Sequence, residues 1–252
     1  MPNVTSHSPG TFCWIELGTS DPGGAKTFYA QLFGWTVNET AMGEGESYYI
    51  FQKNGADAAA MYKQGKEQEG VPPNWLSYVS VSDADAATEK AQSLGATVLS
   101  GPFDVAEHGR MTMLIDPQGA AFAVWQAKSS IGVGVRDEAG TLCWNELQAR
   151  NVEVARTFYA ALFGWGMKVS PEYTELAAGD QAIGGIMTSQ APPEAPSNWM
   201  PYFAVDDCDA SAGKAQSLGG AIYVPPMDIP NAGRFAVVAD PQGAVFAIIR
   251  LG

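Results

Sequence analysis

The sequence is short of positive charge and of long apolar runs. Its 252 residues carry 14 Lys and Arg against 27 Asp and Glu, which gives a formal net charge of −13 at pH 7. This negative charge repels nucleic acid and anionic membrane surfaces, and no basic cluster offsets it. No run of about 18 apolar residues occurs, and residues 1–10 lack the basic start and apolar stretch of a secretory signal. We therefore expect a cytoplasmic protein that binds neither nucleic acid nor membranes.

Histidine and cysteine are also scarce. The two histidines are His7 and His108, so a histidine-rich metal site is excluded. Three cysteines without CxxC spacing predict neither a disulfide framework nor a zinc site. Cys13 and Cys143 each precede Trp in an apolar stretch, which favours small buried side chains over reactive thiols. The sequence also lacks a phosphate-binding P-loop and a Gly-x-Ser-x-Gly nucleophile motif.

Two segments of the chain occur twice. Residues 28–35, FYAQLFGW, return as FYAALFGW at 158–165, and DPQGA at 116–120 returns at 240–244. The order of the two segments is the same in both copies, so the chain is a tandem duplication. We expect two domains, residues 1–128 and 140–252, joined by a linker at residues 129–139. A domain of roughly 120 residues is long enough to bury its own core.

Each half in turn contains the pattern βαβββ twice. Asp21-Pro22 and Asp83 are helix N-cap signals, Gly34 and Gly95 end those helices, and Asn54-Gly55 indicates a hairpin. The other predicted segments follow from apolar periodicity. The predicted strands of the first half are residues 12–17, 35–38, 47–52, 56–61, 76–81, 97–99, 111–115 and 122–126. The fold class is therefore α+β, with four βαβββ modules.

With these modules around them, the segments Asp21…Phe28-Tyr29…Phe33-Gly34-Trp35 and Gly109-Arg110…Asp116-Pro117-Gln118-Gly119 resemble the vicinal oxygen chelate superfamily. This superfamily includes glyoxalase I, extradiol dioxygenases, fosfomycin-resistance enzymes and bleomycin-resistance binding proteins. The resemblance implies two glyoxalase/bleomycin-resistance-like domains in tandem. It also implies that paired modules curl their sheet into a cup, and that catalytic members hold a divalent metal there. Fold alone does not establish which of these activities applies.

The metal-ligand positions implied by the resemblance hold unsuitable side chains. Counting from the helix-opening Asp or Asn and from the DPQG motif identifies six positions, which are Trp14, Leu76, Ala123, Trp144, Met200 and Ala247. None of these side chains binds a hard or borderline cation. We therefore expect no metal and no other cofactor, and a standard glyoxalase I activity is disfavoured.

Strand alternation predicts what lines each cup. The inward face carries an aromatic and apolar set with one carboxylate and one phenol per half, namely Trp14, Glu16, Leu76, Tyr78 and Trp125, then Trp144, Glu146, Met200 and Tyr202. Trp75 and Trp199, at the entrance to a strand, are expected at the rim. Arg110 and Arg234 are expected either to form ion pairs, including with Glu16 and Glu146, or to bind an anionic ligand. Alternatively, the aromatic side chains fill each cup as core.

Two functions fit this lining. The first is metal-independent binding of a bulky, partly aromatic or polycyclic small molecule, such as an antibiotic or another secondary metabolite, for sequestration or in a carrier or accessory role beside an enzyme partner in a biosynthetic pathway. The second is a metal-free lyase or isomerase, or an accessory to a hydroxylase, in which Glu16 or Glu146 is the general base and Tyr78 or Tyr202 donates a proton.

Overall fold

A computed structural model describes residues 4–43 and 46–252, and it confirms the βαβββ order in all four modules. The elements of the first half are β1 Phe12–Thr19, α1 Pro22–Phe33, β2 Thr36–Gly43, β3 Glu46–Lys53, β4 Ala56–Lys63, the 3-10 turn η1 Lys66–Gln68, β5 Asn74–Ser80, α2 Ala84–Ser93, β6 Thr97–Val105, β7 Gly109–Ile115 and β8 Ala121–Ala127. Those of the second half are β9 Leu142–Ala149, α3 Val152–Phe163, β10 Gly166–Val169, β11 Tyr173–Ala178, β12 Gln181–Thr188, β13 Asn198–Ala204, α4 Cys208–Ser217, β14 Ala221–Ile229, β15 Gly233–Ala239 and β16 Val245–Leu251.

The predicted caps and turn form as expected. The Asp21 carboxylate accepts a hydrogen bond from the backbone N–H of Gly24, and the Asp83 carboxylate accepts one from Ala86. Gly34 follows α1 with a φ of 72°, in the left-handed region that glycine adopts without strain. Asn54 and Gly55 join β3 to β4 with φ angles of 51° and 80°, as a type I′ hairpin requires.

Each half builds one eight-stranded mixed sheet. The strand orders are β2-β3-β4-β1-β5-β8-β7-β6 and β10-β11-β12-β9-β13-β16-β15-β14. The two modules of a half meet at an antiparallel pair, β1 with β5 and β9 with β13, while β4 and β8 run parallel to β1 and β5. The central strands of each sheet therefore come from both of its modules.

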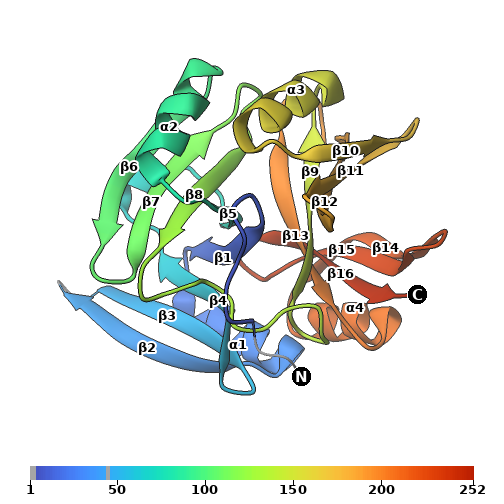
Figure 1. The fold of residues 1–252 in the computed structure, drawn as a ribbon. Coiled ribbons are helices and arrows are strands. Elements are labelled where there is room, and N and C mark those ends of the chain that lie inside the picture. Colours follow the sequence, from blue (N-terminus) through green and yellow to red (C-terminus); the bar gives the residue numbers. More distant parts are fainter. Residues whose placement is uncertain (1–3, 44–45) are drawn as a thin grey trace.

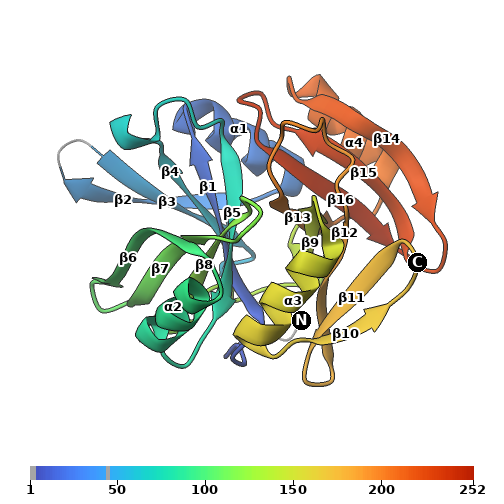
Figure 2. The same ribbon diagram turned by 90° about the horizontal axis from the view of Figure 1, so that it is seen from above.

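The two sheets stand back to back (Figure 1). Their central strands β5 and β13 contact each other, and the outer strands diverge, so that the concave faces open to opposite sides. Helices α1 and α4 fill one of the spaces between the sheets, and α2 and α3 fill the other (Figure 2). We call the concave side of the sheet formed by β1–β8 the first concave face and that of the sheet formed by β9–β16 the second concave face.

The core between the sheets is shared by the two halves. One cluster combines Tyr29 of α1 with Phe203 and Phe246 of the second sheet, and the other combines Tyr159 of α3 with Phe122 of the first sheet. Each half is long enough to bury a core of its own, but residues of both halves form the core between the sheets. An amphipathic helix packs wherever an apolar surface is available, and here that surface belongs to both sheets.

The repeated segments bond to each other across the two halves. The Tyr29 hydroxyl donates to the Asp240 carboxylate at 2.9 Å, and the Tyr159 hydroxyl donates to Asp116 at 3.0 Å. In the same way, the Trp35 indole donates to the carbonyl of Gly140 and the Trp165 indole to that of Gly10, both at 2.7 Å. The FYxxLFGW and DPQG segments thus form the junction between the halves.

The cysteines are free and buried, as the sequence predicts. Burial raises the pKa of the Cys143 thiol to about 12 and that of Cys208 to about 11, and it also raises the pKa of Cys13. Thiols that remain protonated at neutral pH are poor nucleophiles, so their role is packing. Within the described ranges, no helix is long and apolar enough to cross a membrane.

Candidate functional site

The centre of the first concave face is a buried carboxylate held by phenols. Glu16 lies on β1, and its exposed fraction is 9%. Its Oε1 accepts a hydrogen bond from the Tyr48 hydroxyl at 2.6 Å, and its Oε2 accepts one from Tyr78 at 2.7 Å. The Trp14 indole lies near the Tyr48 hydroxyl and partly offsets the rise in its pKa. Both carboxylate oxygens are therefore satisfied, as burial of such a group requires.

The second concave face repeats this arrangement with one addition. Tyr202 donates to Oε1 of Glu146 at 2.8 Å, and the nearby Tyr173 hydroxyl acts to lower the pKa of this carboxyl group. The Trp144 indole donates to the Tyr173 hydroxyl at 2.8 Å. The addition is Gln148, whose side-chain amide also donates to Oε1, at 2.6 Å. A glutamate, two tyrosines and a tryptophan thus lie together at the centre of each face.

Apolar side chains surround each network and pack against one another. On the first face they include Leu76, Met111 and Trp125, each less than a tenth exposed, with Trp14 packed beside them. On the second face Met200 and Ile249 take the corresponding places, with Trp144 beside them. Trp14, Tyr48 and Trp144 remain partly exposed. Each face is therefore an aromatic and apolar layer with one carboxylate at its centre.

Burial controls the ionisation of both carboxyl groups. Desolvation raises the pKa of Glu16 and of Glu146, and the phenolic hydrogen bonds oppose this by stabilising the charged form. Desolvation and the adjacent carboxylate raise the pKa of Tyr78 and Tyr202, so these phenols stay protonated at neutral pH and act as hydrogen-bond donors. The cluster is therefore suited to holding a proton near the carboxylate.

The raised pKa values predict a pH dependence of stability. Above the unfolded pKa of about 4.3, the unfolded chain releases protons that the folded Glu16 and Glu146 still hold, so the free energy of unfolding falls as the pH rises toward the folded pKa values. The Glu16→Gln, Glu146→Gln double variant removes both groups and should flatten this fall. Urea unfolding of the unsubstituted chain and of the double variant between about pH 4.5 and pH 7.5 checks the prediction. If the free energy of unfolding changes with pH by the same amount in both proteins, the prediction is contradicted.

The residues on the concave faces do not fit a divalent metal. Trp14, Leu76 and Ala123, the positions that the resemblance assigns to ligands, lie on neighbouring central strands as expected. Their side chains carry no oxygen, and no nitrogen that binds metal. The nearby Glu16 supplies a single carboxylate, whose two oxygens are occupied by phenols. Trp144, Met200 and Ala247 lie at the same positions on the second face, so no catalytic step is assigned to a metal on either face.

Two predicted rim residues lie elsewhere. Trp75 and Trp199 are buried in the core between the sheets, where their indoles donate to the hydroxyls of Tyr29 and Tyr159 at 3.1 and 2.8 Å. The prediction that they border the cups was wrong. Each precedes an inward-facing residue in its strand, and alternation places it on the opposite face.

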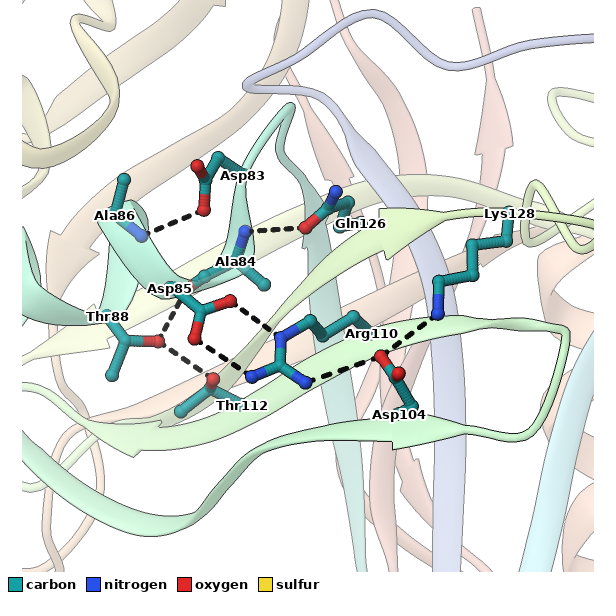
Figure 3. Close-up of polar contacts among 10 residues, drawn as sticks. All are labelled: Asp83, Ala84, Asp85, Ala86, Thr88, Asp104, Arg110, Thr112, Gln126 and Lys128. Atoms are coloured by element: carbon teal, nitrogen blue, oxygen red, sulfur yellow. Dashed lines mark hydrogen bonds and ion pairs between the residues drawn. The ribbon is translucent and has the colours of Figure 1, made fainter.

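The two arginines are also away from the concave faces. Arg110 donates to Asp85 at the start of α2 and to Asp104 on β6, and Lys128 pairs with the same Asp104 (Figure 3). Arg234 makes the equivalent bonds to Asp209 and Asp228. The arginines thus form ion pairs, as predicted, but their partners are not Glu16 and Glu146. Neither arginine is placed to bind a ligand on the concave faces. Each arginine connects a helix start to the adjacent hairpin.

Three residues of the networks were not predicted from the sequence, namely Tyr48, Tyr173 and Gln148. Glu16 pairs with Ala60 of β4, so Ala60 and Tyr62, two positions further along, face the same side of the sheet. Tyr48 on β3 pairs with Tyr62 and therefore also faces inward. Tyr173 has the same place on β11. Alternation extended outward from β1 and β9 would have identified them. Tyr173 also borders a hollow of about 330 Å³ between the first turn of α3 and the turn from β10 to β11.

Comparison with known proteins finds a matching family and similar proteins. A family model described as the Glyoxalase/Bleomycin resistance protein/Dioxygenase superfamily matches residues 11–124 and 141–248. A protein named "Putative glyoxylase CFP32" from Mycobacterium tuberculosis is 40% identical over 257 residues, covering 99% of this chain and 98% of that protein. "Anthracycline biosynthesis protein DnrV" from Streptomyces peucetius is 34% identical over 268 residues, covering 98% of this chain and 96% of that protein.

Solved structures share the fold at low sequence identity. The Mn(II)-bound glyoxalase from Novosphingobium aromaticivorans superposes with a TM-score of 0.67 at 17% identity, covering 96% of this chain and 82% of that one. The 2,3-dioxygenase LapB from Pseudomonas sp. KL28 gives a TM-score of 0.68 at 13% identity, covering 98% of this chain and 94% of that one. At these identities the likeness concerns the fold alone.

Proposed function

Since this chain belongs to the Glyoxalase/Bleomycin resistance protein/Dioxygenase superfamily, we propose that it uses the concave faces of that fold to bind a bulky, partly aromatic small molecule without a metal. The observation that carries the proposal is the Glu16–Tyr48–Tyr78 network, and its counterpart at Glu146, set in an aromatic and apolar layer. Ring stacking on such a layer supplies affinity, and a few polar groups fix the orientation of the ligand.

The relatives indicate the chemical class. DnrV and DauV are named anthracycline biosynthesis proteins, and this chain is similar to them over nearly its whole length. Anthracyclines are planar polycyclic aromatic compounds with phenolic hydroxyls, and phenolic hydroxyls donate well to carboxylates. We extend this class to the ligand of the present chain, a secondary metabolite that the protein sequesters, carries or presents to an enzyme of a biosynthetic pathway in the cytoplasm.

Titration with 1,8-dihydroxyanthraquinone tests the proposal. Because the chain contains seven tryptophans, of which Trp14 and Trp144 lie on the concave faces, we expect saturable quenching of the intrinsic fluorescence. The affinity should be the same with and without a chelator, and mass spectrometry should recover the compound unchanged. Binding that depends on an added divalent metal would contradict the proposal.

A second candidate function is favoured by the raised pKa of the buried carboxyl groups. A carboxylate whose pKa is raised is a stronger general base near neutral pH, and Tyr78 or Tyr202 lies within hydrogen-bond distance to return a proton. Proton abstraction beside a carbonyl is the chemistry that these groups allow. In that case the Glu16→Gln, Glu146→Gln variant should lose hydrogen–deuterium exchange of a bound ketone while it keeps the quenching. Equal exchange in both proteins excludes this function.

A further inference from the structure

Among the positions at which the two concave faces differ is the pair Trp125 and Ile249. Trp125 on β8 pairs with Met111 of β7, and Ile249 on β16 pairs with Phe235 of β15. The Trp125 ring lies directly over Gly109, because a Cβ at Gly109 would be only 2.3 Å from it. The closest atoms to a Cβ at the equivalent Gly233 are instead backbone atoms of Arg250 and Leu251. A large side chain therefore covers this end of the first face, and a smaller one occupies the place on the second.

The segment between the halves holds Trp125 in this position. The Trp125 indole donates to the carbonyl of Ser130 at 3.0 Å. Further along, the backbone N–H of Val133 donates to the carbonyl of Cys13 at 2.8 Å and that of Gly134 to the carbonyl of Asp57 at 2.7 Å. The segment thus runs across the ends of β1 and β4. It belongs to one face only, since it joins β8 to β9.

The exposure of neighbouring side chains follows this difference. Gly109 and Met111, beneath Trp125, are buried, and Met111 is 7% exposed. Their counterparts Gly233 and Phe235 are both partly exposed. The smaller Ile249 therefore leaves an aromatic ring accessible on the second face.

This accessible ring is next to the carboxylate network. Phe235 stacks on Tyr202, with ring centroids 6.4 Å apart and planes at 21°. The Tyr202 hydroxyl in turn donates to Oε1 of Glu146. A planar molecule lying on Phe235 would therefore have an aromatic surface beneath it, and Tyr202 would separate it from the Glu146 carboxylate. The first face has the flexible side chain of Met111 at this place, covered by Trp125.

Resting on the proposed function, we propose that the two faces are not equivalent and that the ligand binds to the second concave face alone. Its planar ring system stacks on Phe235, in the space that Trp125 fills on the first face, and one of its hydroxyl groups bonds to the Tyr202–Glu146 pair. The first face, covered at this end by Trp125, has a structural role. The duplication thus supplies one binding site and one supporting half.

Calorimetric titration of the full chain with 1,8-dihydroxyanthraquinone tests this assignment. We expect one bound molecule per chain. Phe235→Ala should raise Kd about tenfold, since it removes the stacking surface, and Met111→Ala at the equivalent position should leave Kd unchanged. Ile249→Trp should abolish binding by placing a tryptophan where the first face has one. Trp125→Ile should open the first face and add a second, weaker site.

The outcomes separate this inference from the proposed function. Two equal sites in the unsubstituted chain, or a Kd that responds to Met111→Ala and not to Phe235→Ala, would overturn the assignment to the second face and leave the proposed function standing. No binding by the unsubstituted chain would overturn the proposed function itself. Because Phe235→Ala only shortens a partly exposed side chain, its effect can be measured even if Ile249→Trp does not fold. Circular dichroism of each variant identifies any loss of folding.

Discussion

Tyr29→Ala is expected to lower the free energy of unfolding of the whole chain by about 4 kcal/mol. The Tyr29 side chain is completely buried and contacts the rings of Trp75 and Phe246. Its removal leaves a cavity, and it also deprives the Asp240 carboxylate and the Trp75 indole of a hydrogen-bond partner. Since Phe246 and Asp240 belong to the other half, the loss should be felt in both halves.

Urea unfolding and scanning calorimetry check this expectation. We expect one cooperative transition in the unsubstituted chain and in the variant, shifted as a whole to lower stability. Tyr223→Ala is the matched control, because Tyr223 is 60% exposed on the edge strand β14 and its loss should change stability by no more than about 0.5 kcal/mol. Two separate transitions, with only one of them shifted by Tyr29→Ala, would show that the halves are independent.

Gly132→Ala should cost about 3 kcal/mol of stability. Gly132 has a φ of 107°, which a residue with a Cβ rarely adopts, and a Cβ there would lie 2.1 Å from the carbonyl oxygen of Cys13. The carbonyl oxygen belongs to the backbone and the position of a Cβ is fixed by the backbone, so no side-chain rotation relieves the clash. Residues near 132 would have to move away from β1, and the hydrogen bond from Val133 to Cys13 would be lost.

The control for this substitution lies two residues further along. A Cβ at Gly134 would be 3.5 Å from its nearest neighbour, the Cβ of Ala56, and its φ is outside the left-handed region. Gly134→Ala should therefore be nearly neutral. Chemical denaturation of the two variants in parallel measures the difference, and equal stabilities would contradict the close approach of Gly132 to β1.

Local features of the chain were predicted correctly from the sequence because their causes are local. The cap at Asp21, the helix end at Gly34 and the hairpin at Asn54-Gly55 each depend on a few adjacent residues. The bond from Tyr29 to Asp240 joins positions 211 residues apart, and no periodicity encodes such a pairing. The sequence therefore predicts the elements and the repeat but not the packing of α1 and α3 against aromatic residues of the other half.

The residues at the centre of the candidate site were predicted from the sequence, and those contributed by the outer strands were not. Counting from the helix caps and alternating along β1 and β5 placed Glu16 and Tyr78 on one face, and the structure joins them at 2.7 Å. Tyr48 was missed because its place depends on the register between β3 and β4, which the hairpin turn sets. Arg110 was considered as a partner of Glu16, but its bonds to Asp85 and Asp104 lie on the helix side of the sheet.

The crossed contacts at the junction have a consequence for how the two copies can diverge. Tyr29 bonds to Asp240, and Tyr159 bonds to Asp116. A substitution at one of these residues therefore affects a partner in the other copy, and a compensating substitution would have to occur there. At the junction, likeness between the copies therefore marks the surfaces that hold them together. Where the copies differ on the concave faces, as at Trp125 and Ile249 or at Gly18 and Gln148, substitution is free to tune what each face accepts.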